Sequence, residues 1–410
     1  MDNRPIKLFK QIFKDTDCII VSLILNINIL RFFMNTQDTN LLLYLLFIIT
    51  IFVLSKRYFN NIILISRYNV NIRIYSQFLI FILIYGLISC VFITHDFVTY
   101  FKFLVAITIG WLCLGFTPTK ISKVYVYFFI LNIVYSIIIM ANPTKVNAYM
   151  SGGEVNYLNM TLTLGLCLTF SLVNMVLYYY YSNYRRFFIA AGLSSLFFIT
   201  LMAFAARGVL LFPPLIALFI AFSNSKRHKK KLVGIIILFC LLLIVAFFYF
   251  MNNASEYALA HMTGLVEDTE DESRLRVWAR SIQAIIDNLW LFWGAGLNGF
   301  KEVMTFYPHN IFLHLLADFG IIPMLLFLYI SFLVCRGYAK IHSIPLDFQK
   351  KYLNIITFAA FAYYLMTFSK SFSLYDCCPF LISISFCLKL TSGLRYKNYK
   401  FLLGNSKVCL

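Results

Sequence analysis

Charged residues are scarce in this chain of 410 residues. They make up 13% of it, whereas hydrophobic residues make up 61%. An ordinary soluble domain is about 25% charged and about 45–50% apolar, so this composition excludes one. Apolar runs of roughly 18 residues or more, the length that crosses a hydrocarbon core, recur along the sequence. Because lipid cannot hydrogen-bond to an exposed backbone, each spanning segment must be a helix, and the sequence predicts an all-α polytopic membrane protein.

Three further features are missing from the sequence. The ten cysteines do not suggest a disulfide framework, because most lie inside apolar runs, where cysteine behaves as a small apolar residue. The first apolar run is followed by no small-residue cleavage site, so we expect it to stay as a membrane anchor rather than to be removed as a signal peptide. A repeat at a solenoid period is also not evident.

About twelve apolar segments are predicted to span the membrane. The seventh and eighth form one run that is interrupted only by Arg207-Gly208. As a single helix this run would be about 54 Å long, which is too long for one crossing, so two crossings with a turn at the glycine fit better. The predicted spans are residues 18–35, 40–55, 76–94, 98–116, 124–141, 158–180, 187–206, 208–223, 232–251, 311–335, 352–369 and 379–392.

The formal net charge of +18 is explained by membrane topology rather than by nucleic-acid binding. If both termini are cytoplasmic, most of the 35 lysines and arginines fall on the inner side, as the positive-inside rule requires. The exceptions are Arg31, Lys102, Lys145, Arg207, Arg274, Arg276, Arg280, Lys301 and Lys370. We therefore expect a multi-pass protein with both termini in the cytoplasm and no nucleic-acid partner.

One outer segment, residues 252–310, is much longer than a turn and divides the chain in three. Residues 1–251 form an N-terminal transmembrane bundle of about nine spans, and residues 311–410 hold the C-terminal spans and a basic cytoplasmic tail. Long ordered segments in compact proteins are usually functional. We expect the large outer loop to hold the working part of the protein.

Within this loop, residues 273–289 have the pattern of an amphipathic helix. Its expected apolar face consists of Leu275, Trp278, Ile282, Ile285, Ile286 and Leu289. Arg274 lies beside that face, and Arg276 and Arg280 point to the polar side. Such a helix would lie in the membrane surface with its arginines at phosphate depth. Two interpretations of these arginines are open: they bind a phosphorylated substrate, or they only anchor the helix to lipid headgroups.

Glycines follow the helix closely, at positions 294, 296 and 299. A glycine-rich loop of this kind either cradles a phosphate or makes a bend that returns the chain to the membrane. The bend is the interpretation that we favour, because a lone glycine cluster is weak evidence for a phosphate site.

A polar motif, Tyr307-Pro308-His309-Asn310, stands where the loop meets the tenth predicted span. His309 is a candidate general base, since imidazole titrates near neutral pH, or else a helix-capping residue. His314 and Asp318 lie deeper in that span. Ionisable groups inside a membrane are costly and point to function by default, although they also make polar contacts between helices.

Arg207 is the other notable charge, because it interrupts an apolar run on the outer side. An arginine there either binds an anion such as phosphate or extends its side chain to the membrane surface. We predict no metal site. The acidic run 267–272 has the pattern of a solvated loop, and the acid pair Asp15-Thr16-Asp17 lies on the expected inner side.

Several of these motifs occur over residues 205–325 in an order that resembles the signature region of the O-antigen polymerase and O-antigen ligase superfamily. The motifs are Asp271-Glu272-Ser273-Arg274, Trp278, Gly294-Ala295-Gly296, His309-Asn310, Leu313 and Gly320. Ala206-Arg207-Gly208 is similar to the Ser-Arg-Gly element of this superfamily, with Ala206 in place of the common serine. The sequence also departs from the pattern at Asp318, where the family often has glutamate, and at Pro323, where it often has glycine.

The resemblance implies a membrane glycosyltransferase of the GT-C type on the outer side of the bacterial inner membrane. Its donor would be a glycan on undecaprenyl diphosphate. Arg207 and Arg274 would stabilise the charge that develops on the diphosphate, without a metal or another cofactor. His309 would take the proton of the acceptor hydroxyl or position that hydroxyl. Tyr307, Asn310, Arg276 and Arg280 are further candidates for contacts with sugar or phosphate.

The favoured function is O-antigen polymerase, because the loop motifs are degenerate, as is usual for enzymes that differ with every sugar repeat. The main alternative is O-antigen ligase, which uses the same donor and moves the finished chain to lipid A core. A polysaccharide transporter or flippase, or a non-catalytic membrane scaffold, would explain the motifs differently. Membrane lipid and a polysaccharide chain-length regulator are the expected partners, the latter through the resemblance alone.

Overall fold

The structure, a computed structural model, describes residues 15–27, 36–142, 157–202, 207–224, 231–235, 270–343, 348–370 and 373–392, together with the single positions 237, 244 and 248. These residues form helices and connecting turns without any β-strand. Seven of the described helices are long and apolar enough to cross a membrane. The prediction of an all-α polytopic membrane protein is therefore confirmed.

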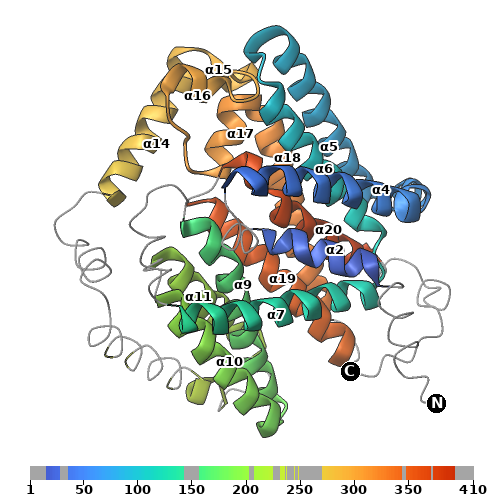
Figure 1. The fold of residues 1–410 in the computed structure, drawn as a ribbon, viewed down its shortest axis with the longest axis vertical. Helices are drawn as coiled ribbons and strands as arrows, with labels where there is room; N and C mark the ends of the chain where they lie inside the picture. Colours follow the sequence, from blue (N-terminus) through green and yellow to red (C-terminus); the bar gives the residue numbers. More distant parts are fainter. Residues whose placement is uncertain are drawn as a thin grey trace. The chain divides into compact units, whose positions relative to one another are not determined.

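Figure 1 labels the helices in chain order. The longer ones are α2 (Thr16–Leu25), α4 (Thr36–Tyr68), α5 (Val70–Ser89), α6 (Phe97–Leu112), α7 (Pro118–Ala141), α9 (Tyr157–Tyr180), α10 (Tyr184–Met202), α11 (Arg207–Asn224), α14 (Glu270–Asp287), α17 (Ile311–Phe319), α18 (Ile321–Ser343), α19 (Phe348–Phe368) and α20 (Cys378–Ser392). Two short helices, α15 (Trp290–Trp293) and α16 (Gly299–Met304), connect α14 to α17.

Most predicted spans correspond to a helix, but the tenth does not form one continuous helix. The segment 311–335 is broken at Gly320, which has φ of 83° and separates α17 from α18. A side chain at this position would overlap the carbonyl of Phe292, so the break brings another segment close to the backbone. The predicted span 232–251 lies almost wholly outside the described residues, and the total of twelve spans stays a prediction.

The chain divides into two compact units, which are described separately. One unit consists of residues 1–25, 36–128 and 273–410, and the other of residues 26–35 and 129–272. The three-part division expected along the chain stays a prediction.

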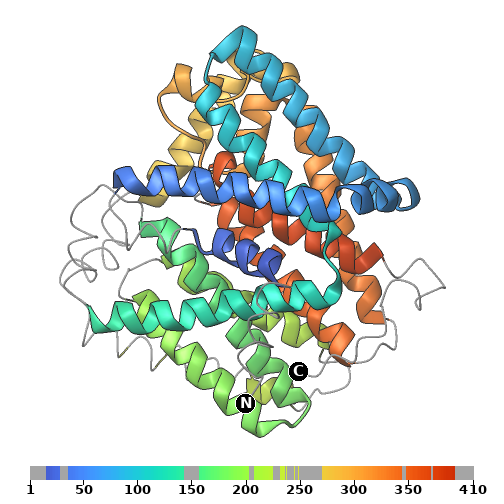
Figure 2. The same cartoon turned by 45° about the vertical axis from the view of Figure 1, so that its right-hand side comes forward.

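In the first unit, α20 is a central helix that packs against α5, α6, α18 and α19. Gly110 on α6 allows α20 to approach closely, because a Cβ there would come within 2.6 Å of the Leu381 side chain. The Ser385 hydroxyl donates a hydrogen bond of 2.6 Å to the Gly110 carbonyl, and the Tyr75 hydroxyl donates one of 3.2 Å to the Leu381 carbonyl. Figures 1 and 2 both show α5 and α6 running side by side within this unit.

In the second unit, α9 packs against both α10 and α11. Almost all of its apolar length is buried, and the Tyr180 hydroxyl at its end donates a hydrogen bond of 2.9 Å to the Ala221 carbonyl on α11. Lys231 donates to the Tyr179 and Tyr180 carbonyls and to the Ser182 hydroxyl, which ties the next segment to the end of α9.

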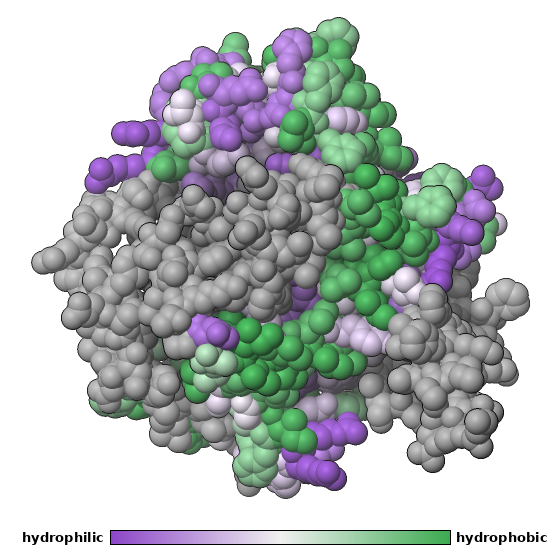
Figure 3. All heavy atoms as spheres, in the orientation of Figure 1, coloured by the Kyte–Doolittle hydropathy of each residue, from purple (hydrophilic) through white to green (hydrophobic). Residues whose placement is uncertain are grey.

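Large apolar side chains cover the outside of the spanning helices, as a lipid environment requires. On α5 and its continuation, Ile84, Ile88 and Phe92 are each more than half exposed. Figure 3 shows hydrophobic side chains over α5 and α6 on the side that it presents, whereas hydrophilic side chains gather near α14 and α16.

Candidate functional site

The segment that carries most sequence candidates is anchored by α14. Its inner face consists of Ser281, Ala284 and Ile285, all of which are buried. Ala284 and Ile285 form one apolar cluster with Phe300 of α16 and Ala317 of α17. Packing of this face fixes α14, α16 and α17 against one another, and Figure 1 shows them grouped together.

The amphipathic helix was expected at residues 273–289, and α14 covers Glu270–Asp287, but only part of its apolar side is buried. Ile285 is buried, whereas Leu275, Ile282 and Ile286 are 61%, 46% and 56% exposed. The apolar side of α14 is therefore divided into a buried and an exposed part, because α14 packs on α16 and α17 through Ala284 and Ile285 only. Arg276 and Arg280 have exposed side chains, which agrees with their expected polar position.

The glycine-rich turn after α15 donates its backbone N–H groups to the protein itself. The N–H groups of Ala295 and Gly296 donate to the Ala317 and Asp318 carbonyls at 2.7 and 3.0 Å. The Leu297 N–H donates to the Ser89 hydroxyl at 2.6 Å, and the Asn298 N–H donates to the Asp318 carboxylate at 3.1 Å. These groups have no hydrogen to offer a phosphate in this conformation, so the turn is the bend that the sequence favoured.

Glycine is needed in this turn because of close approaches. Gly294 and Gly296 have φ of 74° and 89°, a region that other residues rarely adopt. A Cβ on Gly294 would overlap the backbone at Asp318, and one on Gly296 would overlap the Ser89 hydroxyl. The glycines thus let the turn lie directly against α17 and α5.

His309 and Asn310 are adjacent but have different surroundings. The Asn310 side chain caps α17, since its Oδ1 accepts hydrogen bonds from the N–H groups of Phe312 and Leu313 at 3.0 and 3.2 Å. Its Nδ2 donates to the Ser369 carbonyl at 2.9 Å. The capping role that the sequence left open for His309 therefore belongs to Asn310, and the His309 side chain is exposed.

Tyr307 connects His309 to the rest of the site. Its half-buried ring lies 6.3 Å from the His309 ring and 5.7 Å from the His314 ring, between centroids. The Lys301 ammonium is 4.7 Å from the centre of the Tyr307 ring, a cation–π contact. His309 itself has φ of 51°, so its backbone is held in the left-handed region.

Asp318 is the centre of a buried hydrogen-bond network behind this motif. It is completely buried, and one carboxylate oxygen, Oδ2, accepts from the Tyr375 hydroxyl and lies 3.2 Å from His314 Nε2. The Leu374 N–H donates to His314 Nδ1 at 3.2 Å, so the proton of a neutral His314 is on Nε2 and faces Asp318. The network joins α17 to the turn before α20.

Burial and the neighbouring Asp318 carboxylate raise the pKa of Tyr375 well above its usual value. Its hydroxyl therefore stays protonated and donates to Asp318. The same hydroxyl accepts a hydrogen bond of 2.7 Å from the Asn298 N–H, so Tyr375 also supports the glycine-rich turn.

Asp96, between α5 and α6, is the second acid of this region. Its carboxylate accepts from the Thr99 N–H at 3.0 Å and from the Asn298 side-chain amide at 2.8 Å. Burial alone would raise the pKa of Asp96, but the bonds from Thr99 and Asn298 and the charge of Lys102 outweigh it and lower the pKa. Asp96 thereby caps α6 and holds the glycine-rich turn at once.

Sequence reasoning did not identify Asp96, Asn298 or Tyr375 as members of this site. Asn298 is separated from Asp96 by 202 residues and from Tyr375 by 77 residues along the chain. No local motif marks such a contact. The sequence offers one signal for these residues. Asp96 lies in a short polar break between two apolar runs, and Tyr375 lies next to Asp376 in another such break.

The two arginines with the leading sequence roles have backbones within helices, but their side chains lie outside the described residues. Arg207 begins α11, in the second unit, and Arg274 lies in the first turns of α14, in the first unit. Their roles stay predictions.

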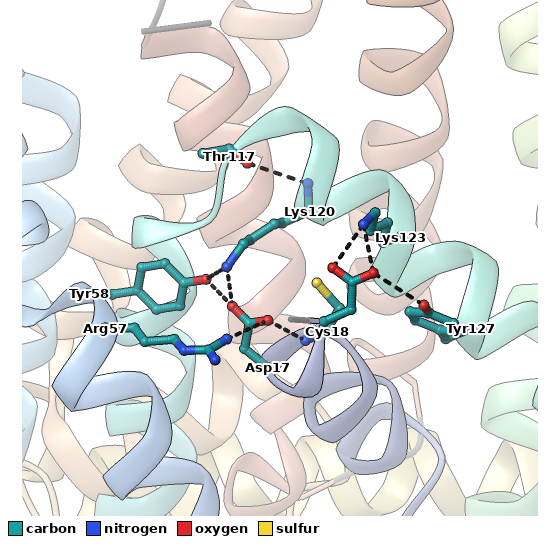
Figure 4. A network of polar contacts seen from close by, with 9 residues as sticks. Asp17, Cys18, Arg57, Tyr58, Thr117, Lys120, Lys123 and Tyr127 are labelled. Atoms are coloured by element: carbon teal, nitrogen blue, oxygen red, sulfur yellow. Dashed lines mark hydrogen bonds and ion pairs between the residues drawn. The ribbon is translucent and has the colours of Figure 1, made fainter. Parts of the chain in front are cut away.

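The acid pair Asp15 and Asp17 lies in a separate network with basic residues (Figure 4). Asp17 is completely buried and pairs with Arg57 of α4 at 3.0 Å and with Lys120 of α7 at 2.5 Å. Asp15 pairs with Lys123 at 2.6 Å. These cations occupy the carboxylates, and among the described residues no group of three metal-binding side chains occurs.

Comparison with known proteins supports the resemblance seen in the sequence. Residues 191–328 match the family described as O-antigen ligase, which confirms the resemblance to the O-antigen polymerase and O-antigen ligase superfamily. No curated protein and no solved structure matches the chain significantly. The matched family indicates a glycosyltransferase-like enzyme of lipopolysaccharide synthesis, and it does not distinguish a polymerase from a ligase.

Proposed function

We propose that this multi-pass membrane protein, which shares the O-antigen ligase family signature, is an O-antigen polymerase. It would join oligosaccharide repeat units linked to undecaprenyl diphosphate into a long-chain polysaccharide at the periplasmic face of the inner membrane. The observation that supports this proposal most directly is the family match over residues 191–328, which includes Arg207, Arg274 and His309. Both termini would be cytoplasmic, in line with the positive-inside distribution of lysine and arginine.

In the proposed reaction, an acceptor sugar hydroxyl attacks the anomeric carbon of the donor glycan. A new carbon–oxygen bond forms as the bond between that carbon and the diphosphate oxygen breaks, and the lipid diphosphate leaves with the bonding electrons. We assign His309 to accept the hydroxyl proton or to position the hydroxyl, since its side chain is exposed and its ring is near Tyr307.

The leaving diphosphate gains negative charge, and we assign Arg207 and Arg274 to stabilise it. An arginine stays charged at any working pH and forms paired hydrogen bonds to phosphate oxygens. Arg276 and Arg280, exposed on α14, and Tyr307 are proposed to contact sugar or phosphate. Asn310 was a further candidate, and its side chain is used for capping and for its bond to Ser369.

The second candidate function is O-antigen ligase, which the description of the matched family favours. It uses the same lipid-linked donor and transfers the polysaccharide to lipid A core. The residue roles given above apply to both reactions, because the leaving group and the attacking hydroxyl are chemically the same. A chain-length regulator is the proposed partner if the protein is a polymerase.

Surface polysaccharide from a strain without this gene separates the two functions. Lipid A core that carries a single repeat unit means that the polymerase is missing. Core without any repeat, with full-length polymer left on undecaprenyl diphosphate, means that the ligase is missing. Core with normal long-chain polysaccharide would contradict both, and loss of all lipid-linked repeats from the outer side would favour a flippase.

A further inference from the structure

The helix α14 has three faces rather than two. The buried face of Ser281, Ala284 and Ile285 packs on the protein. A polar face bears Arg276, Arg280, Gln283 and Asp287. The third face is a stripe of exposed apolar residues at helical spacing, namely Leu275, Ala279, Ile282 and Ile286.

The exposed apolar surface continues beyond the end of α14. Leu289, in the turn, is 70% exposed, and Phe292 and Trp293 of α15 are 59% and 75% exposed. An apolar surface formed by consecutive segments in this way is uncommon on a face in contact with water. We call this set, from Leu275 to Trp293, the α14–α15 stripe.

The stripe adjoins surfaces that belong to membrane spans. The Tyr85 hydroxyl on α5 donates a hydrogen bond to the Trp293 carbonyl. Phe292 and Trp293 also approach the backbone of Gly320, the residue before the span α18 begins. Ile84 and Ile88 on α5 and Ile322 on α18 are all more than half exposed. The stripe therefore adjoins α5 and the start of α18, two spans that also carry exposed apolar side chains.

We propose that the α14–α15 stripe is inserted into the lipid bilayer, so that α14 lies in the plane of the membrane surface. The observations that favour lipid over a protein partner are the contacts with two spans and the order of faces around the helix. Arginines flank the stripe, as expected where guanidinium groups meet headgroup phosphates, and tryptophan is a residue enriched at that depth.

This insertion has a consequence for the candidate site. The opposite face of α14 packs through Ile285 on Phe300 and Ala317, and α17 begins directly after His309. A bilayer that fixes the depth of α14 therefore also fixes the depth of the His309 segment. If the proposed function is correct, the stripe holds the site at the level where the diphosphate of a lipid-anchored donor lies.

Tryptophan fluorescence in lipid vesicles tests the insertion without any need for activity. The full-length protein with Trp111→Phe, Trp278→Phe and Trp290→Phe keeps Trp293 as its only tryptophan. We expect lipids brominated near the headgroup to quench Trp293 more strongly than lipids brominated near the chain end. The matched control carries Trp293→Phe as well and Gln283→Trp on the polar face, and we expect acrylamide in the water to quench it instead.

Three outcomes would overturn the proposal. Quenching of Trp293 by aqueous acrylamide alone would place the stripe in water. Resistance to both quenchers would show that a second copy or another protein covers it. Stronger quenching by lipids brominated near the chain end would mean that the segment is deeper than the surface.

A functional comparison uses two neighbouring exposed positions on different faces of α14. Ile282→Asp puts a charge in the stripe, and Gln283→Asp puts the same charge on the polar face. We expect polysaccharide formation to fall at least tenfold in the first variant and to stay within twofold in the second. If neither variant matters while Trp293 is quenched by lipid, the insertion stands and the link to the proposed function fails.

Discussion

At the scale of single residues, the most informative contrast is between His309 and Asn310. The asparagine side chain bonds to the first turn of α17 and to the Ser369 carbonyl. The histidine side chain next to it is exposed, and its backbone has φ of 51°. Asn310 therefore stabilises the fold, whereas the role proposed for His309 in catalysis stays a prediction.

Replacement of the two residues should have different effects. We expect His309→Ala to reduce polymer formation severely while the amount of protein in the membrane stays normal. Asn310→Ala removes a helix cap and should cost about 1 kcal/mol of stability. Surface polysaccharide on a gel, together with the amount of protein in the membrane, separates the effects. Normal rate and chain length in the histidine variant would make His309 a structural residue.

The arginines at 207 and 274 are expected to be indispensable. We predict that Arg207→Ala and Arg274→Ala each abolish polymer formation, because the charge on the leaving diphosphate would then lack its partner. Arg336→Ala is the control, since Arg336 is exposed on α18 at the expected inner end. Polysaccharide gels of all three variants, at equal amounts of protein, provide the measurement. Long-chain product from either outer arginine variant would contradict the diphosphate role.

At the scale of elements, the glycine-rich turn is the piece that connects the others. It bonds to α17 through Ala317 and Asp318, and to α5 through Ser89. Asp96 and Tyr375 reach it from two further connections. Because all these bonds converge on a few residues, a substitution that distorts the turn should destabilise every element that contacts it.

Gly294→Ala tests this connection. The new Cβ would overlap the backbone at Asp318, which cannot move aside as a flexible side chain can, and φ of 74° adds strain. We expect less folded protein after detergent extraction and a lower unfolding temperature. Gly192→Ala is a matched control, because a Cβ there meets nothing within 4 Å. Equal stability of the two variants would mean that the turn adapts more freely than its contacts suggest.

Tyr375→Phe tests the network around Asp318. The change removes a hydroxyl that donates to a completely buried carboxylate, and the lost bond should cost about 1–3 kcal/mol. Thermal unfolding in detergent provides the measurement. Tyr329→Phe, at an exposed position on α18, is the control and should leave the unfolding temperature unchanged. An unchanged value for Tyr375→Phe would show that water replaces the hydroxyl.

At the scale of the whole molecule, the distribution of charge decides which parts enter lipid and which stay outside. The basic residues predict the orientation of the spans, and some of them are also used inside the first unit. Arg57, Lys120 and Lys123 come from α4 and α7 and pair with Asp17 of α2 and with Asp15, which directly precedes α2. These ion pairs join three helices that are far apart in sequence.

The buried ion pairs lead to a prediction about the stability of the first unit. Asp17→Ala would leave the partly exposed Arg57 and Lys120 without their common partner, and loss of these charged hydrogen bonds should cost about 1.5–3 kcal/mol. Lys123→Ala removes a more exposed residue and should cost less. Unfolding temperatures of both variants provide the measurement. A larger decrease in unfolding temperature for Lys123→Ala than for Asp17→Ala would contradict this order of the two networks.

The sequence by itself determined the helical membrane class, most helix positions and the family signature. Apolar runs and amphipathic spacing are local properties, so they can be read from neighbours along the chain. The bend at the glycines belongs to the same kind of information, whereas the cap of α17 was assigned to Asn310 instead of His309 only by the structure.

Only the tertiary structure decided which face of α14 is buried and which polar residues meet Asp318. Ile285 and Ile286 are alike in sequence, yet one packs on Phe300 and the other is exposed, because α16 and α17 lie along one side of the helix. Likewise, Asp96 and Tyr375 reach the glycine-rich turn from distant segments. Contacts of this kind depend on how helices pack, and the pattern of any single segment does not contain that information.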